Sequence, residues 1–254
     1  MISPTPCSGT DAKSFALTNL HPSDTTLSRA DQTRNVLERM EAALQAEGMN
    51  FTHVVRTWFY LDHILDWYTE FNVVRTAFFK ERDVFKHMVP ASTGVGMANP
   101  DGAAIMAGLI AIKPGSSQVK VFAVPSPLQC PALDYKSSFS RAAEVQVRDK
   151  RHLYISGTAS IDVHGASVHP GNVDAQIHLT MEVVAAILKS RNMRWDSATR
   201  AVAYFKDLHD AARFPAYCMV HGLSGLKTTL VQADICREEL LFEIELDAMT
   251  DRPG

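Results

Sequence analysis

The sequence has little net charge and no pronounced block of one sign. Its 254 residues include 28 acidic residues and 25 lysines or arginines, so the formal net charge is −3. The longest basic cluster, residues 148–151, is interrupted by an aspartate and is typical of a solvated turn beside a strand. Nucleic-acid binding depends on a basic surface, so we expect no nucleic-acid partner.

Long apolar runs and closely paired cysteines are also missing. No segment approaches the roughly 20 apolar residues of a membrane-spanning helix, and residues 1–6 lack the apolar core of a signal peptide. The four cysteines, Cys7, Cys130, Cys218 and Cys236, are widely spaced and form no C-x-x-C pair. This pattern indicates reduced thiols, and we expect a cytoplasmic protein with no membrane partner.

Motifs for nucleotides, metals and cofactors are lacking as well. The sequence has no glycine-rich phosphate loop, dinucleotide fingerprint or nucleophile elbow. Its ten histidines are scattered, and the pair His164 and His169 has no accompanying frame of cysteines or carboxylates. We therefore predict neither a metal site nor a cofactor.

What the sequence does contain is an internal repeat. Residues 32–60 align with residues 176–204 without a gap when 144 is added to each number. Identical residues coincide at Gln32 and Gln176, Glu38 and Glu182, Ala42 and Ala186, Leu44 and Leu188, Met49 and Met193, Arg56 and Arg200, and Tyr60 and Tyr204. A chain of this length accommodates two domains of about 100–150 residues, so the repeat predicts two related domains in tandem.

Both copies show the same order of elements, namely a helix, a strand, a second helix and a last strand. The segments in the first and second copies are a helix at 36–44 and 177–188, a strand at 54–60 and 198–204, and the last strand at 103–112 and 240–248. A front hairpin at 142–157 precedes the second copy, whereas the first copy keeps only a remnant at 14–17.

This pattern predicts an α+β fold of two tandem domains, each a mixed β-sheet packed on two helices. The first domain, residues 1–113, is shortened at its front. Residues 114–138 are rich in proline and are predicted to be an extended, irregular linker. The second domain occupies residues 139–254.

The second copy resembles the RidA (YjgF) family. The resemblance is carried by the strand 155–162 with its Ser-Gly, by Gln176, by the Met193-x-Trp195 edge, by Tyr204 and by the strand beginning at Glu243. It implies domains of the RidA/chorismate-mutase-like type that associate as trimers with sites at the subunit clefts. For a tandem chain, it implies a homotrimer that forms a pseudo-hexameric ring.

The best-known activity of that family is hydrolysis of enamines and imines, which uses an arginine fifteen residues before the first glutamate of the last strand. Thr228 stands at that position, and the adjacent Lys227 would face the other side of a strand. In the first copy the two positions fall near Ser92 and Met106. Neither copy keeps the arginine–glutamate pair.

A branch with tandem domains, the chorismatases, gives a closer resemblance. The last strand of that branch carries a cysteine followed seven residues later by a glutamate. Cys236 and Glu243 have the same spacing. The stretches 135–142, 156–160 and 168–176 also look like that branch. The resemblance implies hydrolysis of the enolpyruvyl ether of chorismate, a small carboxylated metabolite.

Glu243 is the candidate catalytic residue. Strand alternation places Glu243, Glu245 and Asp247 on one face and apolar residues on the other, so the acidic face is either plain solvent or a cleft. In a cleft, burial and neighbouring carboxylates would raise the pKa of Glu243. It would then act as a general acid.

Six further residues are candidates for substrate binding. Cys236 would line the pocket, act as a nucleophile or serve as a small buried hydrophobe. Arg141 would hold a carboxylate or pair with Glu144 on the surface. Tyr135 would form an aromatic wall or pack the linker against the core. The remaining candidates are Tyr204 and the strand-to-loop junction of Gly157 and Thr158, where backbone N–H groups would bind an anion or simply form a tight turn.

The equivalent residues Arg56 and Arg200 are expected to have a structural or interface role, because they recur at one position of the repeat. The leading hypothesis is thus a cytoplasmic, cofactor-free, chorismatase-like hydrolase. Two alternatives are a RidA-type enamine or imine deaminase with altered anchors and a non-catalytic ring that binds a small molecule.

Overall fold

The computed structural model describes residues 11–252, which form two sheets backed by helices. The first half contains β1 (Ala12–Leu20), α1 (Arg29–Ala46), β2 (Val54–Leu61), α2 (Ile64–Glu81), β3 (Ala91–Gly96) and β4 (Ile105–Pro114). The second half contains β5 (Lys120–Val124), β6 (Ala142–Val147), β7 (Lys150–Ala159), α3 (Val173–Ser190), β8 (Ala198–Phe205), α4 (Arg213–Val220), β9 (Thr228–Gln232) and β10 (Phe242–Asp251).

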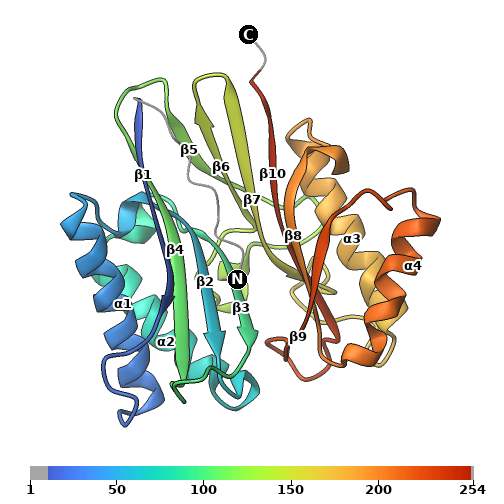
Figure 1. The fold of residues 1–254 in the computed structure, drawn as a ribbon, viewed down its shortest axis with the longest axis horizontal. Helices are drawn as coiled ribbons and strands as arrows, with labels where there is room; N and C mark the ends of the chain where they lie inside the picture. Colours follow the sequence, from blue (N-terminus) through green and yellow to red (C-terminus); the bar gives the residue numbers. More distant parts are fainter. Residues whose placement is uncertain (1–10, 253–254) are drawn as a thin grey trace.

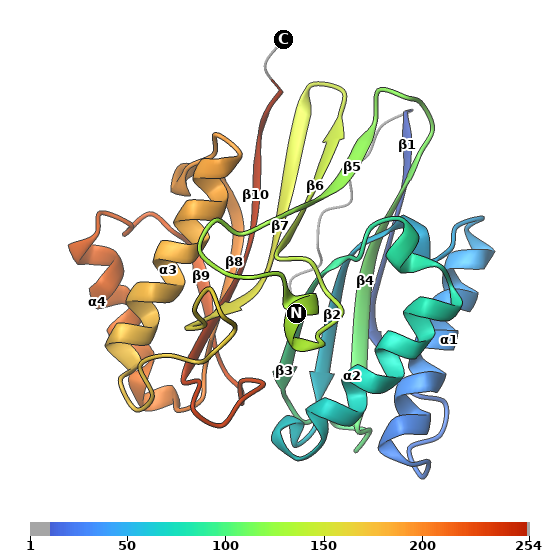
Figure 2. The same ribbon diagram turned by 180° about the vertical axis from the view of Figure 1, so that it is seen from behind.

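Each half is one mixed sheet, as the sequence predicts. The strand order is β1-β4-β2-β3 in the first sheet and β5-β6-β7-β10-β8-β9 in the second. Among the strand pairs of residues 11–252, only β2–β3 and β8–β9 are parallel. Helices α1 and α2 cover the outer face of the first sheet and α3 and α4 that of the second, so the inner faces of the two sheets turn toward each other (Figures 1 and 2).

The repeat offset of 144 holds in three dimensions up to the second helix. It relates α1 to α3 and β2 to β8 end to end. After the second helix, which has 18 residues in α2 and 8 in α4, the offset between β4 and β10 becomes 137. The insertion in the first copy therefore lengthens α2, and this longer helix forms one wall of the site described below.

The repeated glutamine is a structural clamp in both copies. Gln32 donates to the carbonyls of Thr25 and Leu27 and accepts a hydrogen bond from the backbone N–H of Ala104 at 2.8 Å. Gln176 is fully buried and accepts from the backbone N–H of Leu241 at 2.7 Å. In each domain the first helix is thereby tied to the start of the last strand, because a buried amide requires partners for both its donor and its acceptor.

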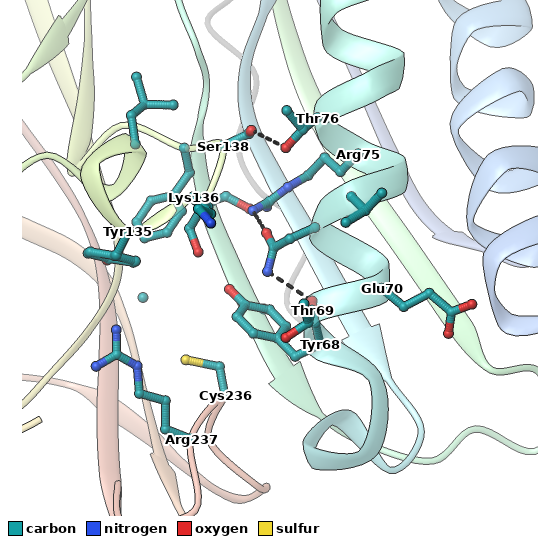
Figure 3. Close-up of a pocket in the computed structure, with 18 of the residues that line it drawn as sticks. Tyr68, Thr69, Glu70, Arg75, Thr76, Tyr135, Lys136, Ser138, Cys236 and Arg237 are labelled. Carbon is teal, nitrogen blue, oxygen red and sulfur yellow. Dashed lines mark hydrogen bonds between the residues drawn. The ribbon is translucent and has the colours of Figure 1, made fainter. Parts of the chain in front are cut away.

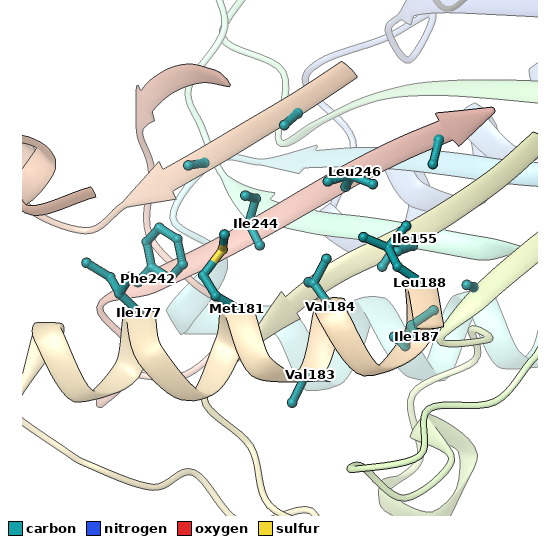
Figure 4. Close-up of a cluster of buried hydrophobic side chains, with 14 of the residues drawn as sticks. Ile155, Ile177, Met181, Val183, Val184, Ile187, Leu188, Phe242, Ile244 and Leu246 are labelled. Carbon is teal, nitrogen blue, oxygen red and sulfur yellow. The ribbon is translucent and has the colours of Figure 1, made fainter. Parts of the chain in front are cut away.

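The helices pack on the sheets through apolar side chains at helical spacing. In the second domain, Ile177, Met181, Val184 and Leu188 of α3 are buried against the apolar face of the second sheet. Figure 4 shows Phe242, Ile244 and Leu246 of β10 pointing toward this helix. Their burial leaves the alternate residues of β10 to face the first domain.

The segment predicted to be an irregular linker contributes a strand to the second sheet. β5 lies within residues 114–138 and pairs antiparallel with β6, from Lys120 opposite Gln146 to Val124 opposite Ala142. The prolines that suggested an irregular segment frame this strand rather than interrupt it, since Pro114 precedes it and Pro125 follows it. The expectation of an irregular course is therefore wrong for residues 120–124.

A buried carboxylate on β10 joins the two domains. Glu245 accepts hydrogen bonds from Arg56 Nη2 at 2.7 Å and Trp58 Nε1 at 2.9 Å, both on β2 of the first domain. It also pairs with Arg200 on β8. Burial opposes the ionisation of Glu245, but Arg56 and Arg200 hold its pKa below the usual value. The two repeat-related arginines thus have the predicted interface role, and they share one carboxylate.

Backbone contacts between β3 and the front of β7 extend this interface. The backbone N–H of Ser92 donates to Ser156 Oγ at 2.9 Å, and that of Gly157 donates to Thr93 Oγ1 at 3.0 Å. Further along, the backbone N–H of Gly96 donates to the carbonyl of Asp234 at 2.7 Å. These bonds fix β3 of the first domain beside the strands that carry the candidate site.

We predict that Arg56→Ala lowers the free energy of unfolding by about 3–5 kcal/mol, because it leaves the buried Glu245 short of a cation. Chemical denaturation followed by circular dichroism measures the effect. Arg213→Ala is the control, since Arg213 forms a half-exposed ion pair with Asp174 and should change little. A loss for Arg56→Ala no larger than that of the control would contradict the role given to Glu245.

Candidate active site between the domains

A cavity of about 1260 Å³, here called the interdomain cleft, lies between the two halves of the chain. One wall comes from α2 and β3 of the first domain. The other comes from the short helix Ala132–Tyr135, from β7 and β10, and from the loop before β10. Figure 3 shows Tyr68 and Arg75 extending from α2 toward Tyr135 and Cys236 on the opposite wall. Both walls of this cleft therefore belong to a single chain.

Glu243 lies in this cleft with its side chain almost fully buried. It is the second residue of β10, opposite Ala159 of β7 and Tyr204 of β8. Burial, reinforced by the neighbouring charge of Glu245, raises the pKa of Glu243 to about 8, while Arg56 and Arg141 oppose the rise. At neutral pH its carboxyl group is therefore mostly protonated and able to donate a proton.

A β-bulge in β7 turns Gly157 toward Glu243. The register between β7 and β10 shifts between Ile244 and Leu246, next to the Ser156-Gly157 pair. A Cβ atom on Gly157 would lie 2.0 Å from Glu243 Oε1. The glycine is required here because the carboxyl group occupies the space that a side chain would need.

Arg141 points into the cleft from the start of β6. Its exposed fraction is 4%, its Nε donates to the carbonyl of Cys130 at 2.9 Å, and its Nη2 has no hydrogen-bond partner among the described residues. The alternative pairing with Glu144 is not formed, because Glu144 binds Arg151 and Arg191 instead. A buried guanidinium with a free donor beside a cavity is suited to hold a carboxylate.

Tyr135 forms an aromatic wall of the cleft. Two guanidinium groups lie over its ring, that of Arg141 at 5.4 Å and that of Arg237 at 5.2 Å from the ring centroid. Arg237 in turn donates to the carbonyl of Gly165 at 2.8 Å. The loop near residue 165 and the short helix that carries Tyr135 are thereby held over the cleft.

Cys236 lines the cleft as a neutral thiol. Burial, and next the charge of Glu243, raise the pKa of Cys236 to about 12. A thiol in this state is a poor nucleophile, since the thiolate is the reactive form. Its place in the cleft fits the predicted pocket-lining role.

Two of the candidate binding residues lie outside the interdomain cleft. Thr158 is 1% exposed and donates to the carbonyl of Ser156 at 2.8 Å, because the residue after Gly157 faces the opposite side of β7. Tyr204 lines a smaller cavity of about 300 Å³ together with Trp58, Tyr60 and Arg200, here called the aromatic cavity. The structure therefore brings together Glu243, Cys236, Arg141, Tyr135 and Gly157, and it separates Thr158 and Tyr204 from them.

The sequence reasoning missed the wall contributed by the first domain. Arg75 of α2 is 1% exposed, and its Nη2 donates to Asn72 Oδ1 at 2.5 Å. Its guanidinium lies 4.9 Å from the ring centroid of Phe71, and its Nε has no hydrogen-bond partner among the described residues. A signal was present, because Arg75 falls on the apolar stripe of α2, four residues after Phe71 and three before Phe78. An arginine is rarely fully buried unless its charge is paired, so its place on an apolar stripe indicates a partner or a ligand.

Within residues 11–252, no group of three histidine, cysteine or acidic side chains is placed to hold a metal ion. The helices in the same range are also not long and apolar enough to cross a membrane. The three cysteines described there, Cys130, Cys218 and Cys236, are free thiols.

Comparison with known proteins matches both halves of the chain. The model of the chorismatase FkbO/Hyg5-like N-terminal family matches residues 6–109, and that of the endoribonuclease L-PSP family matches residues 132–250. Half by half, the chain is therefore similar to a tandem-domain protein of the RidA (YjgF) superfamily. Within that superfamily, the chain is similar to the chorismatase branch.

Individual relatives agree with this placement. A chorismatase of Streptomyces hygroscopicus is 26% identical over 221 residues, which are 78% of this chain and 62% of that protein. A chorismatase of Streptomyces rapamycinicus is 26% identical over 222 residues, 78% of this chain and 64% of that protein. The chain thus spans less than two thirds of the length of these relatives.

A solved chorismatase structure has the same fold. It superposes with a TM-score of 0.73 at 20% sequence identity, covering 96% of this chain and 76% of that one. The two-domain α+β architecture predicted from the repeat is therefore confirmed.

We predict that Gly157→Ala lowers the rate of any reaction that uses Glu243 by at least about tenfold, because the added methyl group displaces the carboxyl group and misplacement by about 1 Å is costly. Turnover measured beside a thermal melt separates this effect from unfolding. Gly225→Ala is the matched control, since its Cβ would meet open space. Equal rates for the two variants would show that the carboxyl group need not occupy its observed position.

Proposed function

We propose that this protein is a chorismatase-like hydrolase that cleaves the enolpyruvyl ether of chorismate. The observation that carries the proposal is Glu243, a buried carboxyl group with a pKa raised to about 8 in a cleft that also presents buried arginines. The names of the relatives, chorismatases, support the choice of substrate.

The proposed reaction begins with proton transfer from Glu243 to the methylene carbon of the enol ether. The resulting oxocarbenium carbon is attacked by water, whose proton passes back to the Glu243 carboxylate. The hemiketal so formed collapses to pyruvate and the ring alcohol. A carboxylic acid that stays protonated at neutral pH is suited to the first step, and its conjugate base is suited to the second.

Two buried arginines on opposite walls support recognition of a dicarboxylate such as chorismate. Arg141 comes from the second domain, lies close enough to Glu243 to oppose the rise of its pKa, and has an unused Nη2. Arg75 comes from α2 of the first domain and lines the same cleft. We propose that they hold the two carboxylates, so that each domain binds one end of the substrate.

The deaminase alternative is less well supported. Thr228, at the position of the family arginine, begins β9 and lies outside the set of residues that line the interdomain cleft. The carboxylate anchor of that chemistry would have to be Arg141 or Arg75 instead. Binding of chorismate without turnover would favour the third hypothesis, a non-catalytic binding protein.

We propose further that the enzyme needs no cofactor, works in the cytoplasm and assembles as a homotrimer. The chemistry above uses only a carboxyl group, arginines and water, which supports the first point. The free thiols support the second. The RidA resemblance supports the third, and the strand edges at β1 and β9 are unpaired within residues 11–252.

We predict that Glu243→Gln reduces pyruvate release from chorismate by about 10²–10⁴-fold, because the amide cannot supply the proton. Pyruvate is followed by a coupled assay and the ring product by mass spectrometry. In the unmodified protein, kcat/KM should fall as the pH rises through about 8, since the protonated acid is the active form of the free protein. A glutamine variant that keeps more than a tenth of the rate would contradict the role of Glu243 as the acid.

We predict that Arg141→Met and Arg75→Met each raise KM for chorismate by about 10–100-fold, because each removes a charge-assisted hydrogen bond to a carboxylate. Steady-state kinetics measures the change, and circular dichroism confirms folding. Arg213→Met is the matched control on the exposed surface of α4. An unchanged KM in either cleft variant would remove that arginine from substrate recognition.

A further inference from the structure

The aromatic cavity lies apart from the interdomain cleft and is not used by the proposed reaction. It occupies about 300 Å³ between the inner faces of the two sheets, with β2 and β4 on one side and β8 and β9 on the other. This volume is at the lower end for small-molecule sites and accommodates a single-ring ligand.

Three aromatic side chains form its walls. Trp58 and Tyr60 come from one face of β2, and Tyr204 comes from β8. Tyr60 and Tyr204 face each other across the cavity from the two domains. Val202 and Val231 complete the lining with aliphatic surface. Aromatic rings on two sides favour a flat, unsaturated ligand over a flexible aliphatic one.

Arg200 is the charged residue in this lining, and its charge is already compensated. One nitrogen pairs with Glu245, while Nη1 lies 3.5 Å from Asp247 Oδ2, at the limit of a hydrogen bond. The two carboxylates disfavour an anionic ligand beside the guanidinium. The weakly engaged Nη1 remains able to donate to a neutral oxygen.

From these features we propose that the aromatic cavity is a second binding site, for an uncharged single-ring aromatic molecule that carries a hydroxyl or carbonyl oxygen. The ring lies among Trp58, Tyr60 and Tyr204, and the oxygen accepts a hydrogen bond from Arg200. This site is independent of the proposed hydrolysis, because it shares no lining residue with the interdomain cleft.

The test uses phenol as the probe and ¹⁵N-labelled full-length protein at pH 7. We expect saturable shifts of amide signals in the lining, at Gly108 and Val231 among others, with a Kd on the order of 1 mM for so small a ligand. Cyclohexanol matches phenol in size without the aromatic ring, and benzoate adds a negative charge. Both should bind at least about tenfold more weakly.

Val231→Trp fills the cavity and should weaken phenol binding at least tenfold, and Thr229→Trp on the same face serves if the first variant fails to fold. Val163→Trp, at an exposed valine elsewhere, should bind as the unmodified protein does. Arg141→Met should also keep phenol binding, which separates this site from the hydrolytic one.

Several results would overturn the proposal. These are equal binding of cyclohexanol, tighter binding of benzoate, shifts confined to the interdomain cleft, or undiminished binding by both tryptophan variants. The proposal would also be overturned if the native mass of the unmodified protein exceeds that of one chain and decreases in Val231→Trp. The cavity would then be covered by another copy of the chain.

Discussion

The arrangement of this protein depends on the buried carboxylate of Glu245. It receives an arginine from each domain, Arg56 and Arg200, and the indole N–H of Trp58. A carboxylate without these partners would be too costly to bury at the junction of two sheets. The same charge stands two residues from Glu243 and contributes, after burial, to its raised pKa. The group that holds the domains together thus also helps to keep the Glu243 carboxyl group protonated.

Duplication explains much of this geometry, and divergence explains the rest. The glutamine clamps, the first helices and the two interface arginines are common to both halves. The length of α2 and the strands β5 and β6 differ between the halves, because α4 is shorter and the first sheet has no counterpart of these two strands. Because α2 is long and β7 carries the bulge at Gly157, one half supplies a wall with Arg75 and the other supplies the acid. The interdomain cleft therefore has two different walls, because the two halves of the chain have diverged at α2 and β7.

The sequence was sufficient for the elements that repeat with a constant offset. The offset of 144 located the first helix and the following strand of each domain, and alternation along β10 placed Glu243 and Glu245 on the face opposite the apolar residues, whereas β3, β5 and β9 were not predicted. Contacts between segments that are far apart in the chain could not be predicted from the sequence pattern. Nothing in the pattern of residues 64–81 says that Arg75 meets a cleft formed with the other domain. Thr158 was misplaced for a related reason, since a bulge changes which residue faces the cleft and leaves no mark in hydrophobic periodicity.

The chemistry of the cleft follows from which of its groups are neutral. Burial keeps both Glu243 and Cys236 protonated near neutral pH, while the two walls present the guanidinium groups of Arg141 and Arg75. A protonated thiol is unreactive, whereas a protonated carboxyl group is a proton donor. An anionic substrate would bring charges that satisfy the arginines, and its own carboxylates would disfavour ionisation of Glu243 still further. In the proposed reaction, binding of the substrate and proton donation by Glu243 would therefore support each other, which favours proton transfer over nucleophilic attack as the first step.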